Sequence, residues 1–139
     1  MILIIRISGL VDVNGDEKEA LHRLRMRRKY SAVLIKPTPE NMSLLIKLRN
    51  LIAYGEIDKK TLTELIAKRG MAVDKSKKID AEKVAEKLSE SSLSELGLKP
   101  FFRLHPPRGG IDAKKHFGVK KGVLGDNGKG INDLVRRML

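Results

Sequence analysis

The stretch Met1-Ile-Leu-Ile-Ile-Arg-Ile7 decides the fold of this chain. A continuous apolar run, without alternation of polar residues, predicts a β-strand whose two faces are both buried. Two further apolar runs follow at Ser31–Lys36 and Leu51–Ile57. We therefore expect Met1–Ile7 to be the central strand of a sheet.

A helix is expected between the first two apolar runs. Asn14-Gly15 predicts a turn, and Asp16 with Glu19 three residues later predicts an N-cap with its capping box. The helix should extend from Glu17 to about Lys29, with most of its basic residues exposed.

A second helix is expected between the second and third apolar runs. Thr38 predicts its N-cap and Pro39 its first residue, with an end near Asn50. The resulting order of strand, helix, strand, helix, strand predicts an α+β fold of the ferredoxin-like, split β-α-β type. In that arrangement an antiparallel sheet carries two helices on one face.

The remaining sequence predicts two further parts beyond this core of residues 1–57. Residues 58–97 have the pattern of a small helical appendage, with Asp58 and Asp80 as N-caps and Gly70 as the end of its first helix. Residues 98–139 form a basic extension. The last nine residues should form an amphipathic helix docked on the body, because apolar residues recur at helical spacing at Ile131, Leu134, Val135 and Met138.

Basic residues gather in two separated blocks, and this pattern indicates the partner. The net charge is +12. Residues 20–36 hold six Lys or Arg and no acid, and residues 98–139 hold ten Lys or Arg and three acids. Such blocks predict a bipartite face for the phosphate backbone of RNA.

The glycine-rich segment Gly122–Gly130 invites comparison with a nucleotide-binding P-loop. Five residues, not four, separate Gly122 from Gly128-Lys129, and Gly130 stands where a magnesium-binding hydroxyl is needed. We therefore expect a flexible loop whose Lys129 contacts RNA phosphates. Because residues 106–130 are rich in Gly, Pro and like charges, we expect them to lack regular structure without RNA.

Catalytic and metal sites are not predicted. The chain has no Cys, and His22, His105 and His116 have no metal-ligand spacing. Asp12, Asn14 and Asp16 resemble the start of a calcium loop, but Glu17 and Arg23 stand where that loop needs Gly and Glu. We expect no enzyme activity, no metal and no cofactor.

The candidate RNA-binding residues are the basic residues of the two blocks. Four arginines among six positions without an interleaved Glu favour phosphate contact over a merely solvated helix face. Phe101 and Phe102 offer rings for base stacking, although a strand Phe101–Leu104 packed into the core is favoured for one of them. The full set is Arg23, Arg25, Arg27, Arg28, Lys29, Arg103, His105, Arg108, Lys114, Lys115, His116, Lys120, Lys121, Lys129, Arg136 and Arg137.

The chain also resembles a known family. The segment from Leu21 to Ile52, with Ser31-x-Val33 and Leu44-Leu45, is similar to the L-thirty family of large-subunit ribosomal proteins. Phe102-Arg-Leu-His-Pro-Pro-Arg-Gly-Gly110 and Ile131-Asn-Asp-Leu-Val-Arg-Arg-Met138 resemble its archaeal-type long form and the related eukaryotic large-subunit ribosomal protein seven.

This resemblance implies a structural ribosomal protein that binds large-subunit rRNA beside neighbouring ribosomal proteins, with a ferredoxin-like core and without catalysis. The apolar run at the N-terminus is too short for a membrane span, and Arg6 interrupts it, so we expect a cytoplasmic protein. A free-standing nucleic-acid-binding regulator or ribosome assembly factor remains the alternative.

Overall fold

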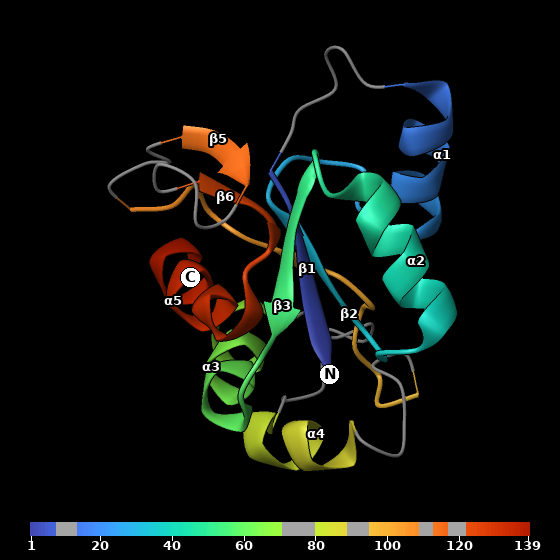
Figure 1. The fold of residues 1–139 in the computed structure, drawn as a ribbon. Coiled ribbons are helices and arrows are strands. Elements are labelled where there is room, and N and C mark those ends of the chain that lie inside the picture. Colours follow the sequence, from blue (N-terminus) through green and yellow to red (C-terminus); the bar gives the residue numbers. More distant parts are fainter. Residues whose placement is uncertain (8–13, 71–79, 89–94, 109–112, 117–121) are drawn as a thin grey trace.

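The computed structural model describes residues 1–7, 14–70, 80–88, 95–108, 113–116 and 122–139 (Figure 1). Within these residues the strands are β1 (Ile2–Arg6), β2 (Ser31–Ile35), β3 (Ile52–Glu56), β4 (Phe102–Arg103), β5 (Ala113–His116) and β6 (Gly122–Asp126). The helices are α1 (Gly15–Arg23), α2 (Pro39–Leu48), α3 (Lys59–Arg69), α4 (Ala81–Lys87), the 3₁₀ turn η1 (Gly128–Gly130) and α5 (Ile131–Met138).

The strands form one sheet in the order β4-β2-β1-β3-β6-β5. β1 pairs antiparallel with both β2 and β3, so the predicted strand-helix-strand-helix-strand core is confirmed. The predicted strand at Phe101–Leu104 is also confirmed, because β4 pairs antiparallel with β2. β6 departs from the expected antiparallel sheet, since it pairs parallel with β3.

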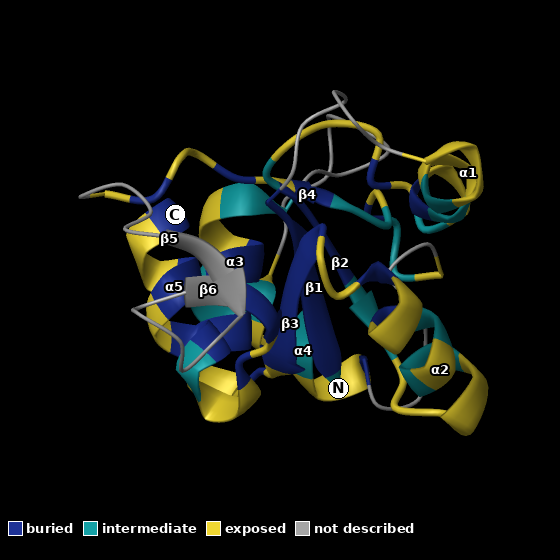
Figure 2. Cartoon of the chain, turned by 45° about the horizontal axis from the view of Figure 1, so that its top comes forward, coloured by how far each residue is buried: buried dark blue, intermediate teal, exposed yellow. Residues whose placement is uncertain are grey.

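Two hydrophobic clusters cover the two faces of the sheet (Figures 1 and 2). On one face, Ile2 and Ile4 of β1 pack with α1 and α2 through Leu21, Leu45 and Leu48. This is the predicted face with two helices. The opposite face is also covered, by α3, α5 and residues beside α4, whose buried side chains pack on Leu3, Ile5 and Ile7.

The C-terminal helix docks as the apolar pattern predicts. Ile131, Leu134, Val135 and Met138 are all buried in the cluster that contains Leu3 and Ile5. Described residues of both α3 and α5 thus share a hydrophobic core with the first strand. The division of the chain at residues 57 and 97 stays a prediction.

Asn132 ties α5 to the body through polar contacts. Its side-chain oxygen accepts from the N–H of Asp58 at 3.0 Å, and its amide nitrogen donates to the carbonyls of Lys129 at 2.9 Å and Glu56 at 3.3 Å. One buried amide therefore joins the end of β3, the start of α3 and the start of α5.

The expectation of an irregular tail is wrong for residues 113–116 and 122–130. Ala113–His116 and Gly122–Asp126 form strands, and η1 follows the second of them after Asn127. The physical reason is close backbone packing: Gly55 of β3 lies against the carbonyl oxygen of Gly128, and Gly125 adopts φ 85° opposite Ala53. In the sequence these glycines suggest a flexible loop. In the structure they permit close backbone contact and strand pairing.

The first helix also differs from its prediction at both ends. Its N-cap is Asn14, whose side chain accepts from the N–H of Asp16, two residues before the expected start. It ends at Arg23 and not near Lys29, because Arg25 turns the backbone left-handed with φ 64°. The N-caps predicted at Thr38, Asp58 and Asp80 are confirmed.

Replacing Gly55 with alanine tests the close packing of β3 on η1. The added Cβ would overlap the Gly128 carbonyl oxygen and lie 2.9 Å from Cβ of Ile131. We expect the free energy of unfolding to fall by about 1–3 kcal/mol in urea titration. Gly15→Ala is the matched control, since its Cβ meets nothing within 4 Å and alanine favours the helix. Equal stability of the two variants would contradict this packing.

A second prediction concerns pH and the N-cap of α3. The backbone N–H of Thr61 donates to the Asp58 carboxylate at 2.7 Å and lowers the pKa of Asp58 below its usual value. Because the folded pKa is depressed, the added stability is present above the unfolded pKa, about 3.9, and is lost as pH falls through the folded pKa.

Asp58→Asn keeps a capping oxygen and removes this titration. We expect the wild type to have the larger free energy of unfolding at pH 7. Its advantage over the variant should shrink as pH is lowered from 7 toward 3, as measured by urea unfolding. At the N-cap of α4, the N–H of Lys83 donates to the Asp80 carboxylate at the longer distance of 3.4 Å. Asp80→Asn should therefore lower the free energy of unfolding at pH 7 by less than Asp58→Asn does. If the difference in free energy of unfolding between the wild type and Asp58→Asn stayed constant from pH 7 to pH 3, the stabilising role given to the Asp58 carboxylate would be refuted.

Candidate nucleic-acid interface

Most of the first basic block, from Arg25 to Lys29, lies not on a helix but in a short loop, Leu24–Tyr30, which we call the arginine loop. The N–H of Arg25 donates to the carbonyl of His22 at 3.0 Å, and the N–H of Met26 donates to that of Leu21 at 2.9 Å. This is a Schellman closure of α1, with a left-handed arginine at the position where glycine is usual. Met26 is fully buried, so the loop is anchored at its centre.

Arg6 of β1 holds this loop from beneath. Its side chain is fully buried, and a guanidinium nitrogen donates to the carbonyl of Met26 at 2.7 Å. The carbonyl of Arg6 accepts from the N–H of Tyr30 at 2.7 Å. Burial lowers the pKa of the Arg6 guanidinium below its usual value. The central strand thus fixes both halves of the loop.

The second basic block reaches the first through strand pairing. β4 pairs with β2 so that Arg103 lies opposite Ser31, the residue that follows the arginine loop. The N–H of Leu104 donates to the carbonyl of Tyr30 at 3.0 Å. Blocks that are far apart in the sequence therefore meet at one edge of the sheet.

Where the blocks meet, the surface is hollowed into a pocket of about 400 Å³, which we call the arginine pocket. The guanidinium carbon of Arg103 lies over the ring of Phe101, 5.6 Å from its centroid. The pocket is lined by Arg25, Arg27, Arg28, Ser31, Phe101 and Arg103.

The segment after β4 continues the basic surface toward the C-terminus. Phe102, Leu104 and Pro107 are buried, whereas Arg103, His105 and Arg108 are exposed. The N–H groups of His105 and Arg108 each donate at 2.9 Å to the last carbonyls of α5, those of Met138 and Arg137. These bonds satisfy helix-end carbonyls that would otherwise lack partners.

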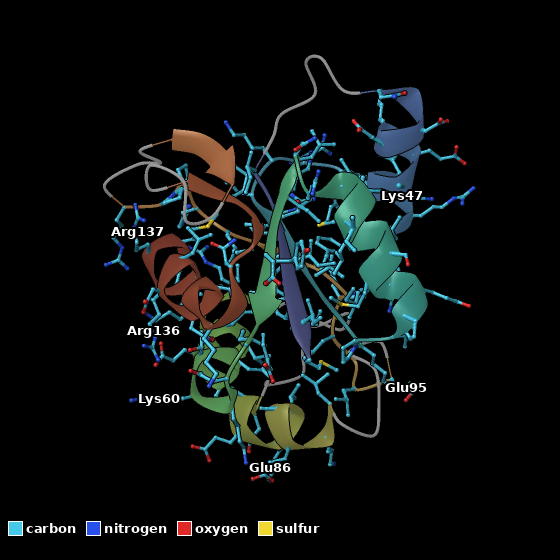
Figure 3. All side chains as sticks on the ribbon, viewed as in Figure 1. Lys47, Lys60, Glu86, Glu95, Arg136 and Arg137 are labelled. Atoms are coloured by element: carbon cyan, nitrogen blue, oxygen red, sulfur yellow. The ribbon has the colours of Figure 1, made fainter. Side chains whose placement is uncertain are left out.

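Arg137 joins the same surface, because its Nε donates to the carbonyl of Arg108 at 3.1 Å. Figure 3 shows Arg136 and Arg137 extending outward from α5. We call the following set the basic strip: Arg25, Arg27, Arg28, Arg103, His105, Arg108 and Arg137.

Several predicted residues lie apart from the basic strip. Arg23 is on α1 and pairs with Glu19 at 2.7 Å, and Arg136 faces Glu64 of α3 at 3.6 Å. Lys129 precedes α5, about 12 Å along the helix axis from the end that His105 caps. Lys29 belongs to the arginine loop but does not line the pocket, and its ammonium lies over the ring of Tyr30, 5.1 Å from its centroid.

The remaining predicted residues are only partly described or not described. Lys114, Lys115 and His116 belong to β5, at the sheet edge opposite β4, and their side chains are not described. Lys120 and Lys121 lie outside the described residues.

Two other kinds of site have no candidate among the described residues. No group of three His, Asp or Glu side chains in that part of the chain is placed to hold a metal ion. No described helix is long and apolar enough to cross a membrane.

Comparison with known proteins identifies the family. No protein-family model matches the chain. It is 39% identical to "Large ribosomal subunit protein uL30" of Nanoarchaeum equitans, over 98% of this chain and 97% of that protein. It is 38% identical to the protein of that name from Methanobrevibacter smithii over the whole of both chains, and 37% identical to that of Pyrobaculum islandicum over 98% and 92%. The chain belongs to the uL30 family, in its archaeal form.

In this uL30 chain, three residues of the interface were not predicted as such from the sequence. Arg6 was visible as a charge inside an apolar strand, a pattern that calls for a buried partner. Ser31 had no distinguishing signal. Phe101 was considered for stacking, and the structure divides the pair as strand alternation requires: Phe102 is buried, whereas Phe101 is half-buried at the pocket.

The left-handed arginine yields a prediction of its own. That conformation costs a residue with a Cβ about 1 kcal/mol or more, and glycine avoids the cost. Arg25→Gly should therefore raise the free energy of unfolding by about 0.5–1 kcal/mol while removing a charge from the pocket. Arg27→Gly is the control: it removes the same charge where φ is not positive, so it should lower stability by up to about 1 kcal/mol. Urea unfolding distinguishes the two signs, and a loss of stability in both variants would contradict the argument.

Proposed function

We propose that the chain is a structural constituent of the large ribosomal subunit and binds rRNA through the basic strip. It is a ribosomal protein rather than an enzyme, and its place is the cytoplasmic ribosome, beside neighbouring ribosomal proteins. The support for this role is family membership over nearly the whole chain. The support for the surface is geometric.

The observation that carries the proposal is the pairing of β4 with β2. It brings Arg103 beside the arginine loop and so converts two separate basic blocks into one face. The backbone of RNA is a line of phosphates, and a line of cations matches it over several nucleotides. The guanidinium groups add fork-shaped donors that suit phosphate oxygens.

Local charge supports this face over other basic surfaces. None of the four pocket arginines forms an ion pair with a described residue. On the helical surfaces, by contrast, Lys59, Lys83 and Arg136 each pair with an acid. A cation without an acidic neighbour attracts phosphate more strongly, because no local countercharge cancels its field.

Charge neutralisation tests the proposal. We expect Arg25, Arg27, Arg28 and Arg103, all changed to Gln, to reduce the affinity of the full chain for large-subunit rRNA. The slope of log affinity against log salt should also flatten, by about 0.7–0.9 for each phosphate that the variant no longer neutralises. Filter binding over a series of salt concentrations measures both quantities.

The matched control removes the same total charge from other surfaces, by changing Lys47, Lys60, Lys68 and Lys87 to Gln. Figure 3 shows Lys47 and Lys60 on different sides of the molecule. We expect the control to lose little affinity and to keep the wild-type slope. Equal losses in the two variants would mean that net charge, not this surface, binds the RNA. Release of the wild type from purified large subunits in mild salt would instead favour a transient regulator.

A further inference from the structure

We propose that the arginine pocket holds one unpaired nucleotide of the rRNA, with its base stacked on the guanidinium of Arg103 and its phosphates held by the arginine loop. This inference rests on the proposed rRNA contact and specifies its mode. Contact with phosphates alone requires only cations on a surface. The pocket adds a cavity and an aromatic ring, which phosphate contact does not need.

The first argument is the stack formed by Phe101 and Arg103. The ring of Phe101 is held by packing against the buried cluster that includes Met26 and Val33. The Arg103 guanidinium lies over that ring, and both side chains line the pocket. A guanidinium plane supported by a ring is a platform for an unstacked base, which proteins bind by stacking on aromatic or arginine planes.

The second argument is size and charge. A volume of about 400 Å³ lies within the range of small-ligand sites, about 300–1,000 Å³. Among the described residues, the walls carry four arginines and no acid, and Ser31 adds a hydroxyl. An apolar ligand would leave these cations without partners, whereas a nucleotide supplies both a flat base and the negative charges.

The third argument is rigidity. Arg25 and Tyr30, at the two ends of the basic run, both adopt φ 64°, a conformation that side chains with a Cβ rarely adopt. The contacts of Arg6 with Met26 and Tyr30 hold the loop in that form. Strained backbone conformations cluster at functional sites, and a preformed loop lowers the entropy lost on binding.

The experiment uses the full chain bound to its large-subunit rRNA and reads backbone and bases separately. Hydroxyl-radical cleavage maps protection of the RNA backbone, and base-specific chemical modification maps protection of unpaired bases. Arg103→Lys keeps the charge but loses the planar group. We expect this variant to keep the backbone footprint while one unpaired base becomes about five-fold or more reactive.

Two further variants complete the test. Phe101→Leu keeps an apolar side chain and removes the ring, so it should expose the same base. Arg49→Lys is the matched control, since it makes the same change on an exposed residue that lies outside both the pocket and the basic strip. It should leave both maps unchanged.

The outcomes separate the two proposals. A backbone footprint without any base whose protection depends on Arg103 would overturn the nucleotide pocket and leave the rRNA contact standing. The absence of any footprint with the wild type would overturn both. Exposure of the same base by Arg49→Lys would also overturn the pocket, because the effect would then not be specific to the pocket residues.

Discussion

β1 lies at the centre of the sheet with both faces buried, and the other elements are arranged to cover those faces. Every side chain from Ile2 to Ile7 is at most 8% exposed. Burying one such aliphatic side chain stabilises a fold by about 1.5–3 kcal/mol, and exposing either face would forfeit several of these contributions. The two helices of the N-terminal half cover one face. The second face requires apolar stripes from later in the chain, which α3 and α5 supply. The basic C-terminal region is therefore also part of the core.

The same strand organises the basic surface. Arg6 is the one charged residue in this apolar stretch, and its side chain and carbonyl bond the centre and the end of the arginine loop. These bonds couple the position of the loop to that of the central strand. β2 begins where the loop ends and pairs with β4. This pairing fixes the position of Arg103 beside the loop. A binding loop fixed in this way loses less conformational entropy on meeting RNA than a free chain would.

The sequence was sufficient for features that depend on local pattern. The three strands of the core, the caps at Thr38 and Asp58 and the stripe of α5 each follow from residues close together in the chain. It was insufficient where distant segments meet. β6 was not predicted. Its glycine-rich segment forms a strand because the chain packs closely against Gly55 of β3, which is distant in the sequence. The end of α1 was missed because the left-handed residue that ends it is an arginine, and the usual sequence signal for that conformation is glycine. The arginine pocket depends on the pairing of β4 with β2. The sequence predicted both strands but not that they pair with each other.

The net charge of +12 predicts an anionic partner but does not locate the contact. Position depends on which cations lack acids nearby. Arg23 and Arg136 were as strong candidates from the sequence as Arg27 and Arg103, yet the fold places Glu19 and Glu64 beside the first two. Arginines also gather at the pocket, whereas the exposed cations of α3 and α4 are mainly lysines interspersed with glutamates. Lysines in that setting keep a surface hydrated, and arginines without acids present oriented donors. In the proposed rRNA contact, the overall charge attracts the RNA, and the pairing of β4 with β2 determines which side chains meet it.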